Sequence, residues 1–235
     1  VPFHFESNLM PVYTGSFWAL LNPFALLAGV VSFAMLTFHG ANYLMIRTEG
    51  AVYQRAKLAS TLFGSVMLVA FAGAGVWVAM GISGYVITSP VDPGALPDPL
   101  AKTVALQAGA WLANFKAQPL LWAIPGAGFA GGLLGIVCAR ADKPLLAFIA
   151  SAVAELGVIG TAGVAMFPFV MPSSTDLRSS LTVWDSVSSH LTLTVMFWAA
   201  LIFTPIVIAY TGWAYRVMSG KVTAGYIEAN NKSAY

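Results

Sequence analysis

Five long runs of apolar residues, separated by shorter polar segments, set the pattern of this chain. The hydrocarbon core of a bilayer is about 30 Å thick, and a helix needs about 20 mostly apolar residues to cross it. Runs of this length cover residues 23–46, 58–82, 119–139, 145–169 and 191–215. The pattern predicts an all-α polytopic membrane protein of five transmembrane helices, organised as a single transmembrane domain over residues 1–235.

The composition supports a surface that faces lipid. Hydrophobic residues make up 58% of the chain and charged residues only 9%, whereas a soluble domain is about 25% charged. The net charge is +2, and the basic residues form no cluster, which argues against nucleic-acid binding. The one cysteine excludes an internal disulfide framework. Because the sequence begins at Val1 without a signal peptide, we expect its start to be an interior point of a longer chain or a processing site.

The basic residues predict the orientation of the spans. Lys and Arg are enriched in the cytoplasmic loops of membrane proteins. Eight of the eleven basic residues follow the first, third and fifth runs: Arg47, Arg55, Lys57, Arg140, Lys143, Arg216, Lys221 and Lys232. The opposite side holds Lys102, Lys116 and Arg178. We therefore expect the amino end outside and the carboxyl end in the cytoplasm.

Two features are expected on the outer side. Asp98 and Pro99 are typical of a helix start, and apolar residues follow at helical spacing: Ala101, Val104, Ala105, Ala108, Trp111, Leu112 and Phe115. This pattern predicts a short amphipathic helix in the outer loop. Before the last run, Asp185 or Ser186 is a candidate helix cap and Trp184 a candidate interface anchor.

Glycines in the third run indicate close helix packing. Gly128 and Gly132, and also Gly131 and Gly135, have the GxxxG spacing that lets two helix backbones approach in lipid. The spacing favours a packed bundle over independent anchors. We further expect this helix to need a surface supplied by a partner protein.

Two ionisable residues inside the runs are the candidates for chemistry. His39 and Glu155 are costly within a membrane, and the topology above puts both in the cytoplasmic half. They could form part of a proton route or the polar wall of a ligand pocket. Alternatively, each is neutral and hydrogen-bonded to a neighbouring helix. Because the other histidines, His4 and His190, lie near or beyond the outer surface, we expect this chain to bind no haem.

The sequence contains no other catalytic or metal-binding pattern. A nucleophile elbow, a Walker loop and an HExxH motif are absent from it, and no GxGxxG motif follows a predicted strand, so we interpret the glycine-rich stretches as helix-packing glycines and not as phosphate-binding loops. We therefore expect neither a catalytic residue nor a metal site in this chain.

Several stretches together resemble subunit II of the cytochrome bd-type quinol oxidases. They are YTG at 13–15, LNPF at 21–24, GVWV at 75–78, GAWL at 109–112, LWAIP at 121–125, AMFPFVMPSS at 165–174, LTVWDS at 181–186 and IE at 227–228. The run that contains Pro168 and Pro172, followed by Trp184 and Asp185, is the most specific of them.

The resemblance implies a role within a larger respiratory complex. Such an oxidase takes electrons from a membrane quinol and reduces dioxygen to water, and its haem b and haem d are held by the larger subunit I. Subunit II is a structural partner that in some members encloses a quinone or a lipid. A small single-span accessory subunit is a further implied partner. The implied location is the bacterial cytoplasmic (inner) membrane.

The resemblance also defines the fold and leaves alternatives. This chain matches the carboxyl-terminal part of the family, without the amino-terminal four-helix repeat that carries most of the family's assigned proton-route residues. It would therefore form a four-helix transmembrane bundle plus one peripheral transmembrane helix. The alternatives are half of a secondary transporter, which would carry no haem, and a cytochrome that binds haem by itself. Pigment that co-purifies with the chain would separate these possibilities.

Overall fold

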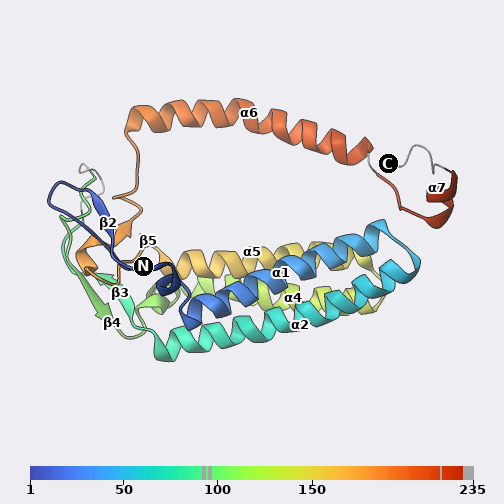
Figure 1. Ribbon diagram of the computed structural model, residues 1–235, viewed down its shortest axis with the longest axis horizontal. Helices are drawn as coiled ribbons and strands as arrows, with labels where there is room; N and C mark the ends of the chain where they lie inside the picture. The colour runs from blue at the N-terminus through green and yellow to red at the C-terminus, as the bar shows by residue number, and fades with distance from the viewer. Residues whose placement is uncertain (92–93, 95–96, 218, 230–235) are drawn as a thin grey trace.

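The computed structural model describes residues 1–91, 94, 97–217 and 219–229. Within them, five helices are long and apolar enough to cross a membrane, which confirms the expected number of spans. They are α1 (Pro23–Arg47), α2 (Gly50–Gly81), α4 (Ala123–Arg140, preceded directly by the 3₁₀ helix η3, Pro119–Trp122), α5 (Pro144–Met166) and α6 (His190–Val217). The protein is thus an α-helical multi-pass membrane protein, with α1, α2, α4 and α5 in one bundle and α6 apart from it (Figure 1).

Local sequence explains where the bundle helices begin and end. The Asn22 side chain caps α1 by accepting a 2.9 Å hydrogen bond from the Ala25 N–H, and Pro23 occupies the first turn. Pro144 likewise occupies the first turn of α5, which has no side-chain cap. The helix α5 ends at Met166, three residues before the expected end of the span, because Pro168 follows it.

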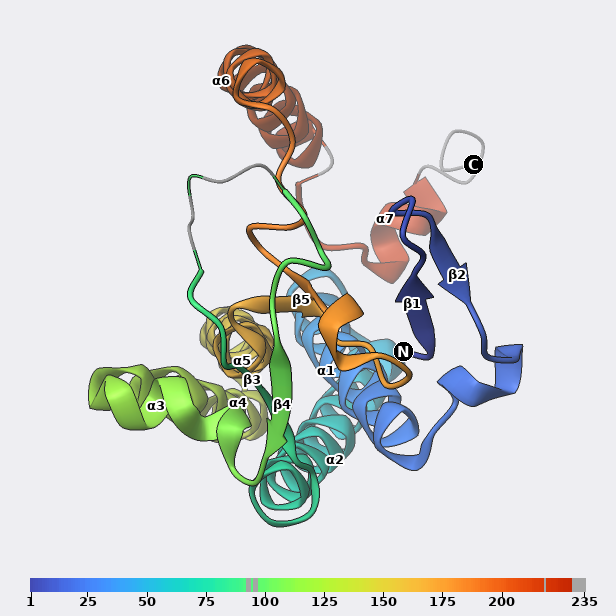
Figure 2. The same ribbon diagram turned by 90° about the vertical axis from the view of Figure 1, so that its left-hand side faces the viewer.

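Three short antiparallel hairpins lie together beyond the end of the bundle where α1 begins (Figures 1 and 2). They pair β1 (Phe3–Phe5) with β2 (Pro11–Tyr13), β3 (Gly84–Ile87) with β4 (Val104–Gln107), and β5 (Phe169–Met171) with β6 (Leu181–Thr182). The remaining elements are the 3₁₀ helices η1 (Phe17–Leu20), η2 (Ala110–Leu112) and η4 (Leu177–Ser179), and the short helices α3 (Ala113–Ala117) and α7 (Ala224–Ala229). The sequence pattern did not predict the hairpins.

The expected amphipathic helix in the outer loop is wrong. Residues 104–107 form strand β4, and only Ala113–Ala117 is α-helical. The Asp98 carboxylate accepts a 2.9 Å hydrogen bond from the Leu100 N–H, but this hydrogen bond stabilises a turn and does not start a helix. Gly109 has a left-handed backbone (φ 73°) that no continuous helix passes through. Of the apolar side chains in this pattern, Phe115 is buried and Trp111 is half-buried, packing on Tyr85 with ring centroids 5.6 Å apart.

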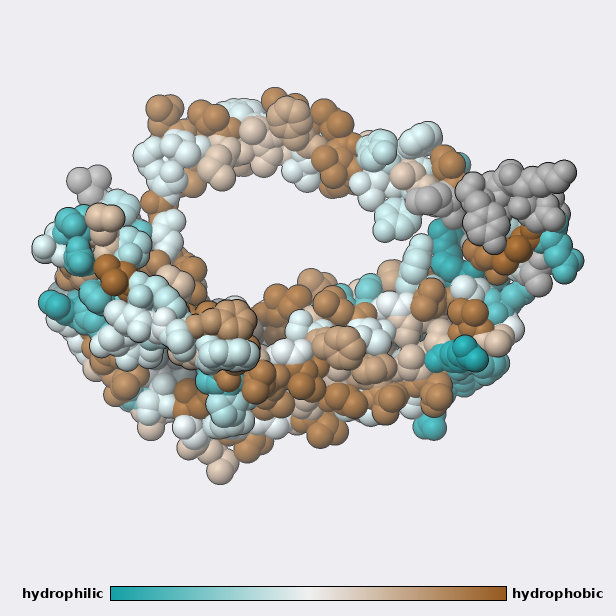
Figure 3. All heavy atoms as spheres, in the orientation of Figure 1, coloured by the Kyte–Doolittle hydropathy of each residue, from teal (hydrophilic) through white to brown (hydrophobic). Residues whose placement is uncertain are grey.

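Apolar side chains fill the bundle in two layers. The larger cluster contains Val31, Ala34, Met35, Phe38, Met67, Ala154 and Val158. The second, nearer the connection between α4 and α5, contains Met45, Ala56, Ala139 and Ala147. The outer faces are also apolar, and Figure 3 shows them as a broad brown band along the bundle. A surface of this kind is solvated by lipid rather than by water.

The glycines of α4 pack against helices of the same chain. Gly131 and Gly132, like Gly128 and Gly135, are buried in the bundle. A Cβ at Gly131 would lie 2.7 Å from the Ala150 carbonyl oxygen on α5, and one at Gly132 would lie 2.7 Å from the Leu68 side chain on α2. The expected bundle packing is confirmed. The expected need for a partner surface stays a prediction and concerns the exposed faces of this helix, because α5 and α2 already cover the glycines.

The last span, α6, stands away from the bundle. None of its 28 residues is buried, and the space-filling view shows an opening between α6 and the other helices (Figure 3). The predicted cap is wrong. The helix begins at His190, and Ser189 caps it by accepting a 3.3 Å hydrogen bond from the Thr192 N–H through its hydroxyl. Asp185 lies too far before His190 to cap the helix, and its carboxylate pairs with Lys102 instead.

The basic segments meet at the opposite end of the molecule from the hairpins (Figure 1). Lys57 of α2 forms a 2.7 Å ion pair with Asp142, which lies between α4 and α5, and the Tyr53 hydroxyl donates a 2.8 Å hydrogen bond to the same carboxylate. These hydrogen bonds, first from Lys57 and then from Tyr53, hold the pKa of Asp142 below its usual value. Arg47 donates a 3.0 Å hydrogen bond to the Gly220 carbonyl oxygen after α6. Described residues from all three basic segments therefore lie at one end, whereas Lys232 falls outside the described residues.

Candidate functional site

A polar group lies between α1 and α5 inside the bundle. The His39 Nδ1 is 2.8 Å from the Ser151 hydroxyl oxygen. The imidazole stacks on Phe148 with ring centroids 4.4 Å apart and an interplanar angle of 28°. The sequence prediction that His39 contacts a neighbouring helix is therefore consistent with the structure, and that helix is α5.

Glu155 belongs to the same group. It is one helical turn beyond Ser151 on α5, so the two side chains share a face. Its Oε1 is buried, and no described residue offers it a hydrogen bond. Because Ser151 engages His39, the imidazole lies close to the turn of α5 that carries Glu155. The structure thus brings together the two residues that burial cost alone had singled out.

A second buried polar contact was missed by the sequence analysis. Asn42 of α1 and Ser60 of α2 are both fully buried, and the Ser60 hydroxyl donates a 2.7 Å hydrogen bond to the Asn42 Oδ1. The available signal was an asparagine within an apolar run, three residues after His39. This contact joins α1 to α2, while His39 joins α1 to α5.

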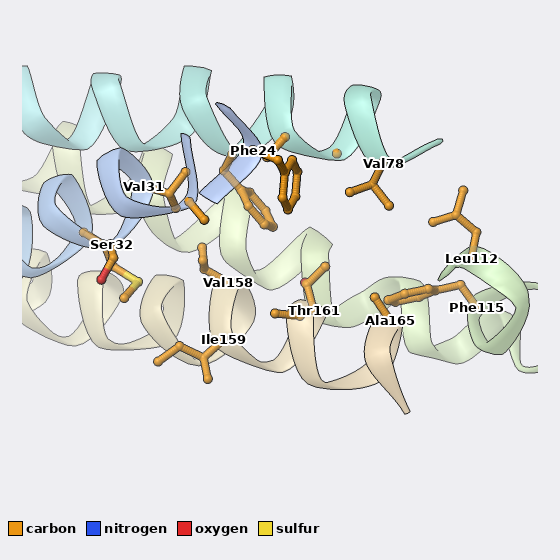
Figure 4. A pocket seen from close by; sticks show the side chains of 16 residues that line it. Phe24, Val31, Ser32, Val78, Leu112, Phe115, Val158, Ile159, Thr161 and Ala165 are labelled. Atoms are coloured by element: carbon orange, nitrogen blue, oxygen red, sulfur yellow. The ribbon is translucent and has the colours of Figure 1, made fainter. Parts of the chain in front are cut away.

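An apolar cavity of about 380 Å³ opens in the other half of the bundle, toward the hairpins. Figure 4 shows its wall, which combines side chains of α1, α2 and α5 with those that follow β4. The labelled residues include Phe24, Val31, Ser32, Val78, Leu112, Phe115, Val158, Ile159, Thr161 and Ala165.

The polar groups in this wall are few. Two of the lining residues, Ser32 and Thr161, carry a hydroxyl group. The Thr161 hydroxyl already donates its proton to the Gly157 carbonyl oxygen at 2.6 Å. Such a wall suits an apolar chain and gives little to hold a polar head group. No sequence pattern signalled the cavity, because its wall comes from four separate segments.

The motif residues of the outer segment hold the hairpins together. The Pro168 carbonyl oxygen accepts a 2.9 Å hydrogen bond from the Val183 N–H, and the Pro172 carbonyl oxygen accepts one from the Val1 amino group at 3.0 Å. Trp184 packs edge-on against Phe167. These contacts give the motif a structural role.

Asp185 takes part in a buried ion pair. Its carboxylate lies 2.7 Å from the Lys102 ammonium group, and the two side chains are only 9% and 7% exposed. The same carboxylate accepts hydrogen bonds from the Thr182 N–H at 2.9 Å and the Thr182 hydroxyl at 2.6 Å. The Lys102 ammonium also donates to the Pro99 carbonyl oxygen at 2.8 Å. Lys102 was used in the sequence analysis only to count charge, and its partner was missed.

Among the described residues, no group of three or more His, Cys, Asp or Glu side chains could hold a metal ion. The polar group of α1 and α5 and the apolar cavity are therefore the two candidate sites. They lie in successive layers of the same helix pair, because Met35, one turn from His39, and Val158, one turn from Glu155, line the cavity.

Comparison with known proteins identifies a matching family and several relatives of the chain. The family described as cytochrome bd terminal oxidase subunit II matches residues 1–218. The cytochrome bd-I ubiquinol oxidase subunit 2 of Escherichia coli K12 is 50% identical over all 235 residues, and the probable cytochrome oxidase subunit 2 of Haemophilus influenzae is 47% identical over the same length. The cytochrome bd ubiquinol oxidase subunit 2 of Bacillus subtilis is 26% identical over 206 residues.

The match covers only part of the relatives. The chain spans 62% of the length of the E. coli and H. influenzae proteins, and its match to the B. subtilis protein covers 52% of that protein. The family match nevertheless extends over nearly the whole chain, and the identity to two relatives is near one half. The chain therefore belongs to the family of cytochrome bd terminal oxidase subunit II.

Proposed function

We propose that this chain is a non-catalytic structural subunit of a membrane oxidase that takes electrons from a quinol and reduces dioxygen to water. Two relatives are named as subunit 2 of a cytochrome bd-type ubiquinol oxidase, which supports an electron-transport role in a respiratory chain. The family membership leaves the transporter alternative without support.

The exposure of α6 carries the structural part of the proposal. A transmembrane helix gains stability in lipid mainly by packing against other helices, yet α6 has no buried residue. Its apolar side chains point in all directions, with Leu191, Phe203 and Trp213 each more than 60% exposed. We assign the missing packing to other parts of the complex and to lipid. The proteins proposed are the larger subunit I, the amino-terminal repeat of subunit II and, as a further partner, a small single-span subunit.

The haems belong to subunit I in this proposal. Among the described residues, His39 is the one histidine deep in a span, and no second histidine lies at comparable depth to complete a ligand pair. Haem b and haem d therefore require ligands from the larger subunit. We place the complex in the bacterial cytoplasmic membrane, with the basic end of the bundle in the cytoplasm and the hairpins outside.

Purification of the complex tests this assignment. The chain, expressed with the larger subunit, is expected to co-purify with haem, and His39→Ala should leave every haem band in the optical spectrum. The chain expressed without that subunit should be colourless. Loss of a single haem band in His39→Ala, with assembly intact, would show that this chain ligates haem.

We assign the apolar cavity to the isoprenoid tail of a quinone or to the acyl chain of a lipid. The basis is the volume of the cavity, about 380 Å³, and its apolar wall, which is formed mainly by three spans. Ala165→Phe is expected to fill the cavity and to remove most of a co-purifying quinone or lipid, measured by native mass spectrometry. Leu156→Phe is the control, because Leu156 lies on the same helix, is 73% exposed and does not line the cavity. Equal amounts of bound molecule in the two variants would refute the assignment.

A further inference from the structure

The hydrogen bonds around Ser151 define the protonation of one His39 nitrogen. The Ser151 hydroxyl oxygen is 2.8 Å from the Phe148 carbonyl oxygen and 2.8 Å from the His39 Nδ1. A carbonyl oxygen only accepts, so the single hydroxyl proton of Ser151 is donated to Phe148. The His39 Nδ1 must then donate its own proton to Ser151. The remaining ring nitrogen, Nε2, makes no hydrogen bond to a described residue and is left as the basic atom of the ring.

Glu155 supplies the complementary group. Its Oε1 is buried without a hydrogen-bond partner among the described residues, and a buried carboxylate without a partner is strongly disfavoured. A protonated carboxyl group needs an acceptor for its O–H. No direct hydrogen bond joins Glu155 to His39 in the structure, so the Nε2 of His39, which Ser151 holds beside this turn of α5, serves as the acceptor through one bridging water molecule.

The surroundings isolate this pair from other charges. The four bundle helices, which the structure describes completely, carry the other ionisable side chains within two turns of their basic ends. These are Tyr43 and Arg47 on α1, Tyr53, Arg55 and Lys57 on α2, and Cys138 and Arg140 on α4. Of these, Tyr43 is the closest in sequence to His39, and it packs against the same Phe148 ring with centroids 5.8 Å apart.

We infer that Glu155 and His39 form a proton-holding pair, in which a neutral carboxylic acid is linked to the unprotonated Nε2 of the imidazole by one bridging water molecule. One proton moves within the pair through the bridging water: the O–H bond of Glu155 breaks as its proton passes to the water, the water gives up one of its own protons to form the N–H bond at Nε2, and the electron pair of the Glu155 O–H bond remains on the carboxylate. The net charge of the pair stays zero, so the exchange adds no net charge to the apolar interior. Ser151 is a positioning residue that holds Nδ1 and thereby aims Nε2. This inference rests on residues of this chain alone and goes beyond the proposed oxidase role.

Infrared spectroscopy of membranes that contain the full-length protein tests the acid. At pH 7 the wild type is expected to show the C=O stretch of a protonated carboxylic acid, although a solvent-exposed glutamate is ionised at this pH. The band should disappear in Glu155→Gln and shift in His39→Gln, which removes the imidazole acceptor. Thr37→Val is the control on α1, because the Thr37 hydroxyl bonds only to its own helix at Phe33, and it should leave the band in place. Identical spectra for the wild type and Glu155→Gln, or an unshifted band in His39→Gln, would overturn the inference.

Nitrogen NMR of the wild type provides a second measurement that needs no folded variant of Glu155. Protein labelled with ¹⁵N-histidine is expected to show His39 as the neutral tautomer with Nδ1 protonated and Nε2 bare, assigned by subtracting the His39→Gln spectrum. A His39 resonance with Nε2 protonated, whether neutral or as imidazolium, would overturn the inference. Neither measurement uses haem or turnover, so each is decided separately from the proposed function.

Discussion

Gly157→Ala is expected to prevent normal packing of the bundle. A Cβ at Gly157 would overlap the Gly128 backbone nitrogen and would lie 2.5 Å from the Gly128 Cα and 2.8 Å from the Ile124 carbonyl oxygen. All three atoms belong to the backbone of α4, so the clash can be relieved only by moving one helix. Overpacking of a core typically costs about 1–3 kcal/mol, and we expect a value at or above the upper end. Thermal unfolding in detergent, followed by size-exclusion chromatography, measures the loss.

Two other glycines provide matched controls for this substitution. Gly163 lies on the same helix, and a Cβ added there would meet no atom within 4 Å, so Gly163→Ala should unfold at the wild-type temperature or slightly above. A Cβ at Gly128 would meet Gly157 at an ordinary 3.4 Å, so Gly128→Ala should have an intermediate effect. Equal unfolding temperatures for all three variants would show that the helices do not approach as closely as the structure indicates.

Lys102→Met is expected to destabilise the hairpin region more than any exposed charge change. It leaves the Asp185 carboxylate buried at 9% exposure with only the Thr182 donors. Removal of one member of a buried ion pair typically costs about 3–5 kcal/mol, because the other charge stays buried without compensation. Limited proteolysis of the outer loops, together with the unfolding temperature, reports the effect.

The double variant Lys102→Met/Asp185→Asn distinguishes the ion pair from simple packing. The asparagine oxygen can still accept the Thr182 hydrogen bonds, and no charge remains buried, so stability should return close to that of the wild type. Arg178→Met is the control, because the Arg178 side chain is 61% exposed in its contact with Asp176, and exposed pairs contribute little. A double variant as unstable as Lys102→Met would indicate that the lost side-chain packing, and not the charge, caused the effect.

The number and length of the spans could be predicted from the sequence because bilayer thickness imposes one local requirement on every helix. The four bundle helices and α6 each satisfy that requirement within their own residues. The candidacy of His39 and Glu155 was also predictable, since an ionisable group within an apolar run is costly in any arrangement of the helices. The glycines of α4 indicated close packing, but the spacing could not say that α5 and α2 of the same chain fill the space.

The outer loop shows the limit of local patterns. The apolar spacing after Asp98 fits a helix, yet residues 104–107 pair with β3, a strand that lies about 20 residues earlier in the chain. Strand pairing and the positive φ of Gly109 override the helical spacing. The Lys102–Asp185 pair joins residues far apart in sequence, and neither residue is unusual by itself.

By itself, the sequence determined that the protein crosses a membrane several times, that its basic loops share one side, and which family it resembles. These properties depend on runs of neighbouring residues. The tertiary structure decided that Ser151 engages the Nδ1 of His39, that Glu155 keeps an unpaired buried oxygen, and that an apolar cavity opens one layer away. Each of these requires side chains from helices that the sequence separates by more than 100 residues, and only the packing of α1 against α5 brings them within contact distance.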